Sequence, residues 1–207
     1  MESGLLLRGN NVENIKNFKL VNGSIKLLAA FGNDRYLLFL ESEDGIDWYE
    51  SQKLFSDDTV KIQYDSDGII RSVVDQPVPQ RGNVYAISML WPINASVAEI
   101  SVEDYPTGVI LDGTWRFDEE TQSVYQDADI ASALTLAKNT QQFNRLLRAC
   151  TDAAFPLQSA LALGIITPEQ QAMLTDLQNY AVTLADTDLT ATPVIWPTPP
   201  ASVKLPL

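Results

Sequence analysis

The sequence predicts an α+β protein, in which a β-rich N-terminal region of antiparallel strands and hairpins precedes a C-terminal helical hairpin and a proline-rich extended tail. Up to Tyr125, turn residues alternate with short segments of period-two apolar patterning, which is typical of strands. From Asp127 to Ala154 glycine and proline are absent, and alanine and leucine are frequent. Five of the 11 prolines follow Thr192 and exclude a helix there. The predicted domains are residues 1–125, 126–190 and 191–207.

Two apolar runs, Ser24–Phe31 and Arg35–Leu40, lie near the N-terminus and are separated by the turn-forming residues Gly32-Asn33-Asp34. We expect them to be neighbouring antiparallel strands. The second run is almost continuously apolar, so it fits either a strand covered on both faces or a strand that meets a partner.

The stretch from Ser42 to Val74 is interpreted as sheet. Within Thr59–Tyr64 the apolar residues share one face, while Lys61 and its polar neighbours share the other. Asp65-Ser66-Asp67-Gly68 reads as a turn, because the further ligands of a calcium loop do not follow. Ile69–Val74 then returns as the second strand of a hairpin.

The segment Gln76–Ser96 has three prolines and a strongly apolar centre, Val84–Trp91. If this centre protrudes, it forms a patch of the kind that marks interaction sites, with Tyr85, Met89 and Trp91 as contact residues. The alternative is a further strand of the core sheet.

The β pattern continues through Val97–Val102 and through a hairpin formed by Gly113–Phe117 and Val124-Tyr125. We expect Trp115 to be a packing anchor.

A long helix is predicted from Asp127 onward, because apolar residues recur there at multiples of three and four. Pro156 is expected to kink or interrupt it before the helical pattern resumes up to Gly164. The residues assigned to its apolar face are Leu136, Phe143, Leu147, Cys150 and Ala154.

Thr167-Pro168-Glu169-Gln170 is a capping-box signal and predicts that a second helix begins there. Its apolar residues Leu174, Leu177, Ala181 and Leu184 should pack against the first helix as an antiparallel hairpin. Trp196 is the residue expected to hold the tail in place.

Composition excludes several functions. The net charge of −13 opposes binding to nucleic acid or to an anionic membrane face. Without histidine and with Cys150 alone, a Cys/His zinc site, a Ser-His-Asp triad and an internal disulfide cannot form within the chain. We expect Cys150 to be a packed thiol. We predict no catalytic, cofactor-binding or metal-binding residue. No secretory signal or membrane span is recognisable, so a cytoplasmic location is expected.

Two sets of residues resemble the bacteriophage tail fibre assembly (Tfa) family, especially its members from Mu-like phages. The first set is Glu43-Asp44-Gly45, Trp48-Tyr49-Glu50, Phe55, Asp58-Thr59, Lys61-Ile62, Tyr64-Asp65 and Ile69-Ile70. The second is Pro156-Leu157, Ala160, Thr167, Glu169, Leu174, Tyr180, Val182, Leu184, Ile195-Trp196-Pro197 and Pro200. The chain departs from the family at Leu177, where many members have tryptophan, and at Gln178-Asn179, where they tend to be basic.

This resemblance implies a non-enzymatic chaperone, working in the cytoplasm of the host bacterium, that binds the C-terminal tip of a trimeric tail fibre and promotes its folding and assembly. It implies that residues 1–125 bind the fibre and that residues 126–190 mediate assembly. Trp48 and Tyr49 join Tyr85, Met89 and Trp91 as predicted partner-binding residues, and weak self-association remains open. The alternatives are a structural virion component, such as a fibre tip or carbohydrate-binding module, and a hydrolase that uses carboxylates alone.

Overall fold

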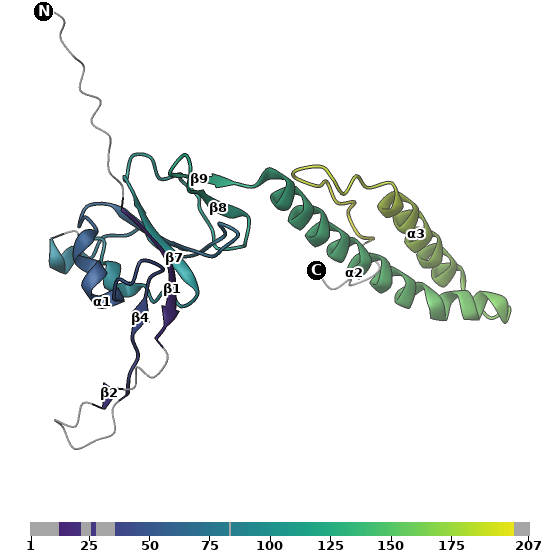
Figure 1. The fold of residues 1–207 in the computed structure, drawn as a ribbon. Coiled ribbons are helices and arrows are strands. Elements are labelled where there is room, and N and C mark those ends of the chain that lie inside the picture. The colour runs from purple at the N-terminus through teal and green to yellow at the C-terminus, as the bar shows by residue number, and fades with distance from the viewer. Residues whose placement is uncertain (1–12, 22–25, 28–35, 83, 201–207) are drawn as a thin grey trace, which may run out of the picture. The chain divides into compact units, whose positions relative to one another are not determined.

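The computed structural model describes residues 13–21, 26–27, 36–82 and 84–200. The chain forms two compact units, Met1–Asp127 and Ala128–Leu207, and each is treated by itself below. The first unit holds the strands and the second holds the two long helices (Figure 1). This confirms the predicted α+β class.

The first unit is built on a five-stranded antiparallel sheet with the order β4-β1-β7-β5-β6. Two separate hairpins, β2-β3 and β8-β9, accompany it. The strands are β1 (Asn14–Leu20), β2 (Lys26–Leu27), β3 (Tyr36–Leu37), β4 (Leu40–Glu41), β5 (Val60–Tyr64), β6 (Ile70–Val74), β7 (Ala95–Ile100), β8 (Trp115–Asp118) and β9 (Ser123–Gln126). The helical elements are α1 (Trp48–Ser51), η2 (Gln52–Leu54), η3 (Pro79–Arg81), η4 (Ile87–Met89), α2 (Ala128–Ala162) and α3 (Pro168–Ala185).

The predicted strand pairs are found. β5 and β6 form the expected hairpin, with Ile62 opposite Val73. β8 and β9 pair from Trp115 to Asp118, and Trp115 packs against the core as expected. Of the two N-terminal runs, only parts lie within the described residues: Lys26–Leu27 and Tyr36–Leu37 pair antiparallel as β2 and β3, whereas Leu40, the end of the second run, belongs to β4 and pairs with β1.

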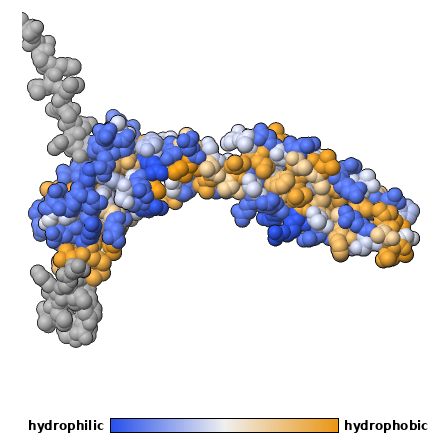
Figure 2. All heavy atoms as spheres, turned by 45° about the vertical axis from the view of Figure 1, so that its right-hand side comes forward, coloured by the Kyte–Doolittle hydropathy of each residue, from blue (hydrophilic) through white to orange (hydrophobic). Residues whose placement is uncertain are grey.

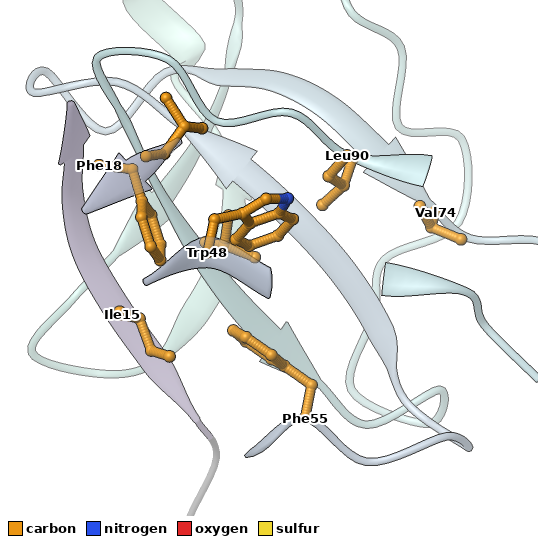
Figure 3. Packing of buried hydrophobic residues seen from close by; sticks show 8 residues of the cluster. Ile15, Phe18, Trp48, Phe55, Val74 and Leu90 are labelled. Atoms are coloured by element: carbon orange, nitrogen blue, oxygen red, sulfur yellow. The ribbon is translucent and has the colours of Figure 1, made fainter. Parts of the chain in front are cut away.

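β7 is the centre of the sheet, and all six of its residues are buried. Successive residues point to opposite faces, so Val97 lies in one apolar cluster and Ala98 in the other. The first cluster contains Trp48 and Phe18, whose rings meet edge to face with centroids 5.2 Å apart (Figure 3). The second cluster contains the apolar face of β5. The sheet is therefore covered on both faces.

Lys61 is a correction to the alternating pattern, since it is buried and not on a solvent face. Its ammonium donates to the carbonyl of Thr59 at 2.7 Å and to that of Ser56, so the loop before β5 satisfies it. Glu99, opposite Lys61 on β7, accepts from the amide of Ser56 at 2.8 Å and from the hydroxyl of Thr59 at 2.6 Å. Lys61 and Glu99 therefore both hold the loop before β5 in place through their bonds to Ser56 and Thr59.

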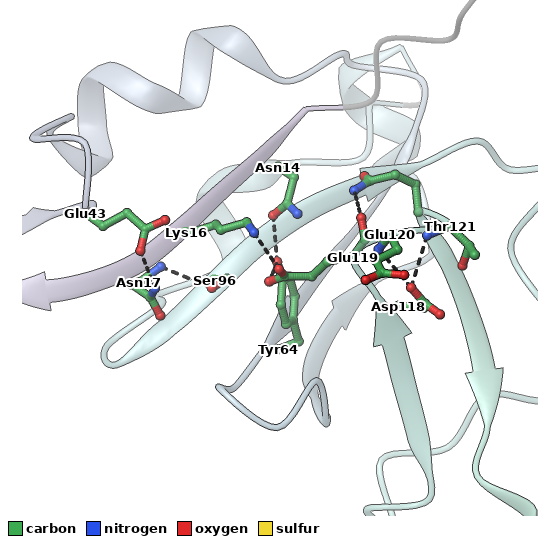
Figure 4. Close-up of polar contacts among 11 residues, drawn as sticks. Asn14, Lys16, Asn17, Glu43, Tyr64, Ser96, Asp118, Glu119, Glu120 and Thr121 are labelled. Carbon is green, nitrogen blue, oxygen red and sulfur yellow. Dashed lines mark hydrogen bonds and ion pairs between the residues drawn. The ribbon is translucent and has the colours of Figure 1, made fainter.

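The β8-β9 hairpin is fastened to the sheet by backbone and side-chain bonds. The amide of Phe117 donates to the carbonyl of Gly68 at 2.8 Å, and a Cβ on Gly68 would lie 2.9 Å from the carbonyl oxygen of Phe117. Glycine is therefore required there by both its φ of +76° and this close approach. Glu119 accepts from the hydroxyl of Tyr64 at 2.8 Å and pairs with Lys16 (Figure 4).

Two segments of the first unit differ from the prediction. Trp48–Ser51, interpreted as sheet, is a single helical turn capped by Asp47, whose carboxylate accepts from the amides of Tyr49 and Glu50 at 2.8 and 3.2 Å. Val84–Trp91 is not an additional strand, because its centre forms the 3₁₀ turn η4. Both turns are too short for a periodic apolar pattern to reveal them.

In the second unit α2 and α3 run side by side (Figure 1) and share one apolar cluster. Pro156 does not interrupt α2. The carbonyl that it leaves without a helical partner belongs to Asp152, an exposed residue, so water can satisfy it. Leu136 is also corrected, since it is exposed and not part of the apolar face.

The start of α3 confirms the capping box. The amide of Gln170 donates to the hydroxyl of Thr167 at 3.2 Å, and the amide of Thr167 donates to the side chain of Gln170 at 3.0 Å. Cys150 is buried as expected, and Trp196 packs against the helical cluster as predicted for the tail. Residues 201–207 of the predicted tail lie outside the described residues.

Candidate partner-binding surface

Three segments of the first unit meet through aromatic rings. Tyr49 of α1 lies 6.0 Å from the ring centroid of Phe39, which precedes β4, and 6.0 Å from that of Trp91, which follows η4. We define as the aromatic surface Phe39, Tyr49 and Trp91, which these ring contacts join, together with Met89, which is exposed on the turn just before Trp91. The structure thus joins two of the predicted contact residues, Tyr49 and Trp91, and adds Phe39.

The helical turn α1 separates two consecutive aromatic residues. Trp48 points into the core and is 1% exposed, whereas Tyr49 is 50% exposed. The Asp47 cap fixes the direction of the turn and therefore which ring points outward. Trp48 was also predicted as a contact residue, but its side chain lies in the core (Figure 3).

The turn η4 presents Met89. The amides of Met89 and Leu90 each donate to a carbonyl three residues back at 3.0 Å, and this turn directs Leu90 into the core. Met89 points to solvent and is 68% exposed. Trp91 is partly buried against the same cluster as Trp48, so part of its ring is held and part is accessible.

Tyr85 lies elsewhere. It packs against both apolar clusters, its amide donates to the carbonyl of Asp57 at 2.9 Å, and the Lys61 ammonium lies 6.0 Å from its ring centroid. These contacts make it a bridge between the core and the loop before β5.

Further exposed apolar side chains lie within five residues of these positions in the chain: Leu38, Leu54 and Ile93. On the face seen in Figure 2 the first unit is mainly hydrophilic, and its apolar residues gather in a few local groups. An aromatic and methionine-containing patch beside charged residues has the composition of a protein-binding site.

The charged side chains of Glu50 and Lys53, which follow Tyr49 in the chain, are exposed to solvent. Lys53 donates to Glu50 at 2.7 Å, and this bond lowers the pKa of the Glu50 carboxyl. Within the described residues, no group of three or more Cys, Asp or Glu side chains is placed to hold a metal ion. No helix in the described part of the chain is long and apolar enough to cross a membrane.

Phe39 is the surface residue that the sequence did not single out. It belongs to the run Arg35–Leu40, whose continuous apolar character fits a buried strand equally well. The sequence contained one indication that Phe39 could lie at a binding surface, because this run also fits a strand that meets a partner.

Comparisons with known proteins match most of the chain to tail fibre assembly proteins. Residues 50–201 match the family model described as Caudovirales tail fibre assembly protein, lambda gpK. Tail fiber assembly protein U′ of Escherichia phage Mu is 28% identical over 188 residues, which cover 90% of this chain and 98% of that protein. Protein U of the same phage is 29% identical over 191 residues, covering 90% and 98%. Tail fiber assembly protein U′ of Escherichia phage P1 is 30% identical over 164 residues, covering 78% and 84%.

Proposed function

Because the chain belongs to the Caudovirales tail fibre assembly protein family, we propose that it is a chaperone that binds the C-terminal tip of a trimeric tail fibre and promotes its folding and assembly. The matches extend across both units, which supports a part for each of them in this role. Its partner is the fibre protein of the same phage, and the two meet in the host cytoplasm, where the fibre is synthesised.

The observation that carries the proposal is the aromatic surface. Its outward groups, Tyr49 and Met89, stand on two turns that are anchored by the buried residues Trp48 and Leu90. A rigid aromatic group loses little conformational entropy on binding, and methionine adapts to partners of different shape. Such a surface suits the capture of an apolar segment.

The mechanism that we propose is non-covalent. An incompletely folded fibre end exposes apolar side chains and unpaired strand edges, and these promote aggregation. Binding of the aromatic surface covers this end while three fibre chains align. The helical unit then acts in assembly, as the family resemblance implies. No nucleotide or cofactor is needed for a step of this kind.

Co-expression of the fibre protein with and without this chain tests the proposal. We expect the fibre to be soluble and trimeric only with the chain present, as measured by native gel electrophoresis and light scattering. Equal yields of soluble trimer in both cultures would contradict the proposal. If the chain instead remained in purified virions as a stoichiometric part and were dispensable for fibre folding, it would be a structural component.

A further inference from the structure

The loop between β7 and β8, residues 101–114, exposes three large apolar side chains. Val102 is 49% exposed, and the neighbours Ile110 and Leu111 are 55% and 53% exposed. Single exposed apolar residues are common on soluble proteins, whereas several of them in one short segment indicate an interaction site. We define Val102, Ile110 and Leu111 as the loop surface. None of them belongs to the aromatic surface.

The loop is held in place at both ends and in its middle. In the middle, Tyr105 and Val109 pack against the second core cluster. At the start, the carbonyl of Ser101 accepts from the amide of Tyr105 at 3.1 Å. At the end, the carboxylate of Asp112 accepts from the amide and the hydroxyl of the buried residue Thr114 at 3.0 and 2.6 Å. The exposed side chains therefore stand on an ordered loop, which loses little conformational entropy when a partner binds.

The loop surface and the aromatic surface belong to opposite faces of the sheet. The two core clusters lie on opposite faces, because β7 contributes Val97 to the first and Ala98 to the second. Trp91 of the aromatic surface packs against the first cluster, whereas Tyr105 and Val109 attach the loop to the second. One segment of a partner cannot cover both surfaces in a single flat contact, so the loop surface requires a segment of its own.

The charge of the loop selects the kind of partner. Residues 101–114 contain three acidic residues and no basic residue, and the acidic residues Glu103, Asp104 and Asp112 are all exposed. Asp75, which follows β6, lies near the same loop, because burial and then this carboxylate raise the pKa of the Tyr105 hydroxyl to about 12. Negative charge of this density repels nucleic acid, an anionic membrane face and a second copy of the chain. It attracts a segment that carries lysine or arginine.

We propose that the loop surface is a second fibre-binding site, which takes an apolar segment of the fibre protein flanked by lysine or arginine, while the aromatic surface binds another segment. This inference rests on the function proposed above. Once one surface has bound, the second contact is intramolecular and takes place at a raised effective concentration. Two contacts, each weak by itself, thus give the first unit a firm hold on the fibre end.

Removal of the exposed apolar groups tests the contact. Ile110→Ser combined with Leu111→Ser should weaken binding to the purified fibre tip by at least about tenfold in isothermal titration calorimetry, because apolar groups at the centre of an interface carry much of its affinity. Val182→Ser, which removes a 65% exposed apolar side chain from α3, is the control and should leave the affinity unchanged. Circular dichroism should show that both variants remain folded.

Reversal of one charge tests the chemistry of the partner and needs no apolar substitution. Glu103→Lys should weaken binding by about tenfold at low salt, and this loss should nearly disappear at about 1 M salt, where charges are screened within about 3 Å. Glu120→Lys makes the same change of net charge at an exposed position of the β8-β9 turn and should leave the affinity unchanged. Equal losses in the two variants would overturn the proposal, because the charge of the loop would then have no special part.

The two surfaces can be separated by combining their variants. If they bind different segments, the losses from Ile110→Ser/Leu111→Ser and from Tyr49→Ser/Met89→Ser should multiply when all four changes are made together. Full affinity of the loop variant beside weak binding by the aromatic variant would overturn the second site and leave the proposed function intact. Absence of fibre binding by the unaltered chain would instead contradict the proposed function itself, and the second site with it.

Discussion

Trp48 and Tyr49 are adjacent in the sequence, but the first is buried in the core and the second is exposed at the surface. The Trp48 ring fills the first core cluster against Phe18, and the Tyr49 ring lies between Phe39 and Trp91 at the surface. The difference comes from one helical turn and its Asp47 cap, because adjacent residues on a helix point in directions about 100° apart. Replacing each residue should therefore give a different defect.

Trp48→Ala should lower the free energy of unfolding of the first unit by about 3–5 kcal/mol, through lost apolar burial and the cavity that remains. Urea unfolding followed by tryptophan fluorescence measures this. Tyr49→Ala is the control, and it should cost less than about 1 kcal/mol because half of its side chain is already in water. Equal losses for both variants would contradict the assignment of core and surface.

Tyr49→Ser combined with Met89→Ser should weaken fibre binding by at least about tenfold, because exposed aromatic and methionine groups commonly dominate a protein interface. Isothermal titration calorimetry of the purified variant with the fibre tip measures the affinity. Tyr125→Ser is the matched control, since Tyr125 on β9 is 44% exposed but lies outside the aromatic surface. If it weakens binding as much, the site lies elsewhere.

At the scale of elements, short pieces of structure are held by specific polar contacts. The β8-β9 hairpin is fastened through Glu119, and α3 begins at the Thr167 capping box. Each contact can be removed without disturbing an apolar core, so each gives a small and separable effect.

Glu119→Gln should reduce stability by less than about 1 kcal/mol at pH 7, because both Glu119 and Lys16 are more than a third exposed to solvent. The bond from Lys16 lowers the pKa of Glu119 in the folded protein. The contribution of the carboxylate is therefore complete above the unfolded value of about 4.3 and is lost as the pH falls through the lower folded value.

Urea titrations of the two proteins across this range measure that dependence. The difference between Glu119→Gln and the unaltered chain should vanish in acid. Glu120→Gln, at the neighbouring exposed position, provides the control and should show no such change. A difference that persists in acid would refute the role of the Glu119 charge.

Thr167→Ala should destabilise the helical unit by about 1 kcal/mol, because it leaves the amide of Gln170 without its acceptor. Thermal unfolding by far-ultraviolet circular dichroism measures the loss. Thr175→Ala changes the same residue type in the middle of the same helix, where alanine is the better helix former, and should cost nothing. A loss of the same size at Thr175 would argue against capping.

Secondary-structure elements with a clear local pattern could be predicted from the sequence. The burial of single side chains could not, because it depends on contacts that only the fold creates. The alternation of β5 and β6 and the capping signal at Thr167 are local, so both could be read from the sequence. Lys61 was assigned to solvent because its acceptors are carbonyls of a loop that only the fold brings near it. In the candidate site, Tyr49 and Trp91 were predicted, but Phe39 was not, since a continuous apolar run does not show which side chain stays exposed.

At the scale of the whole molecule, charge and apolar surface are divided between the units. The first unit carries most of the negative charge together with the aromatic surface, and the second exposes single apolar side chains such as Phe155 and Leu163. A negative charge keeps a protein with exposed aromatic groups soluble and favours a partner with basic groups near its apolar tip. In the role that we propose, the first unit captures the fibre and the second acts in assembly.

Refolding of the denatured fibre protein tests the central claim most directly. The yield of trimer is measured alone, with the unaltered chain, with the Tyr49→Ser/Met89→Ser variant and with Tyr125→Ser. A chaperone that acts through its aromatic surface should raise the yield with the unaltered chain and with Tyr125→Ser, and should lose this effect in the double variant. A yield that is the same with and without the chain, or the same for the double variant and the unaltered chain, would contradict it.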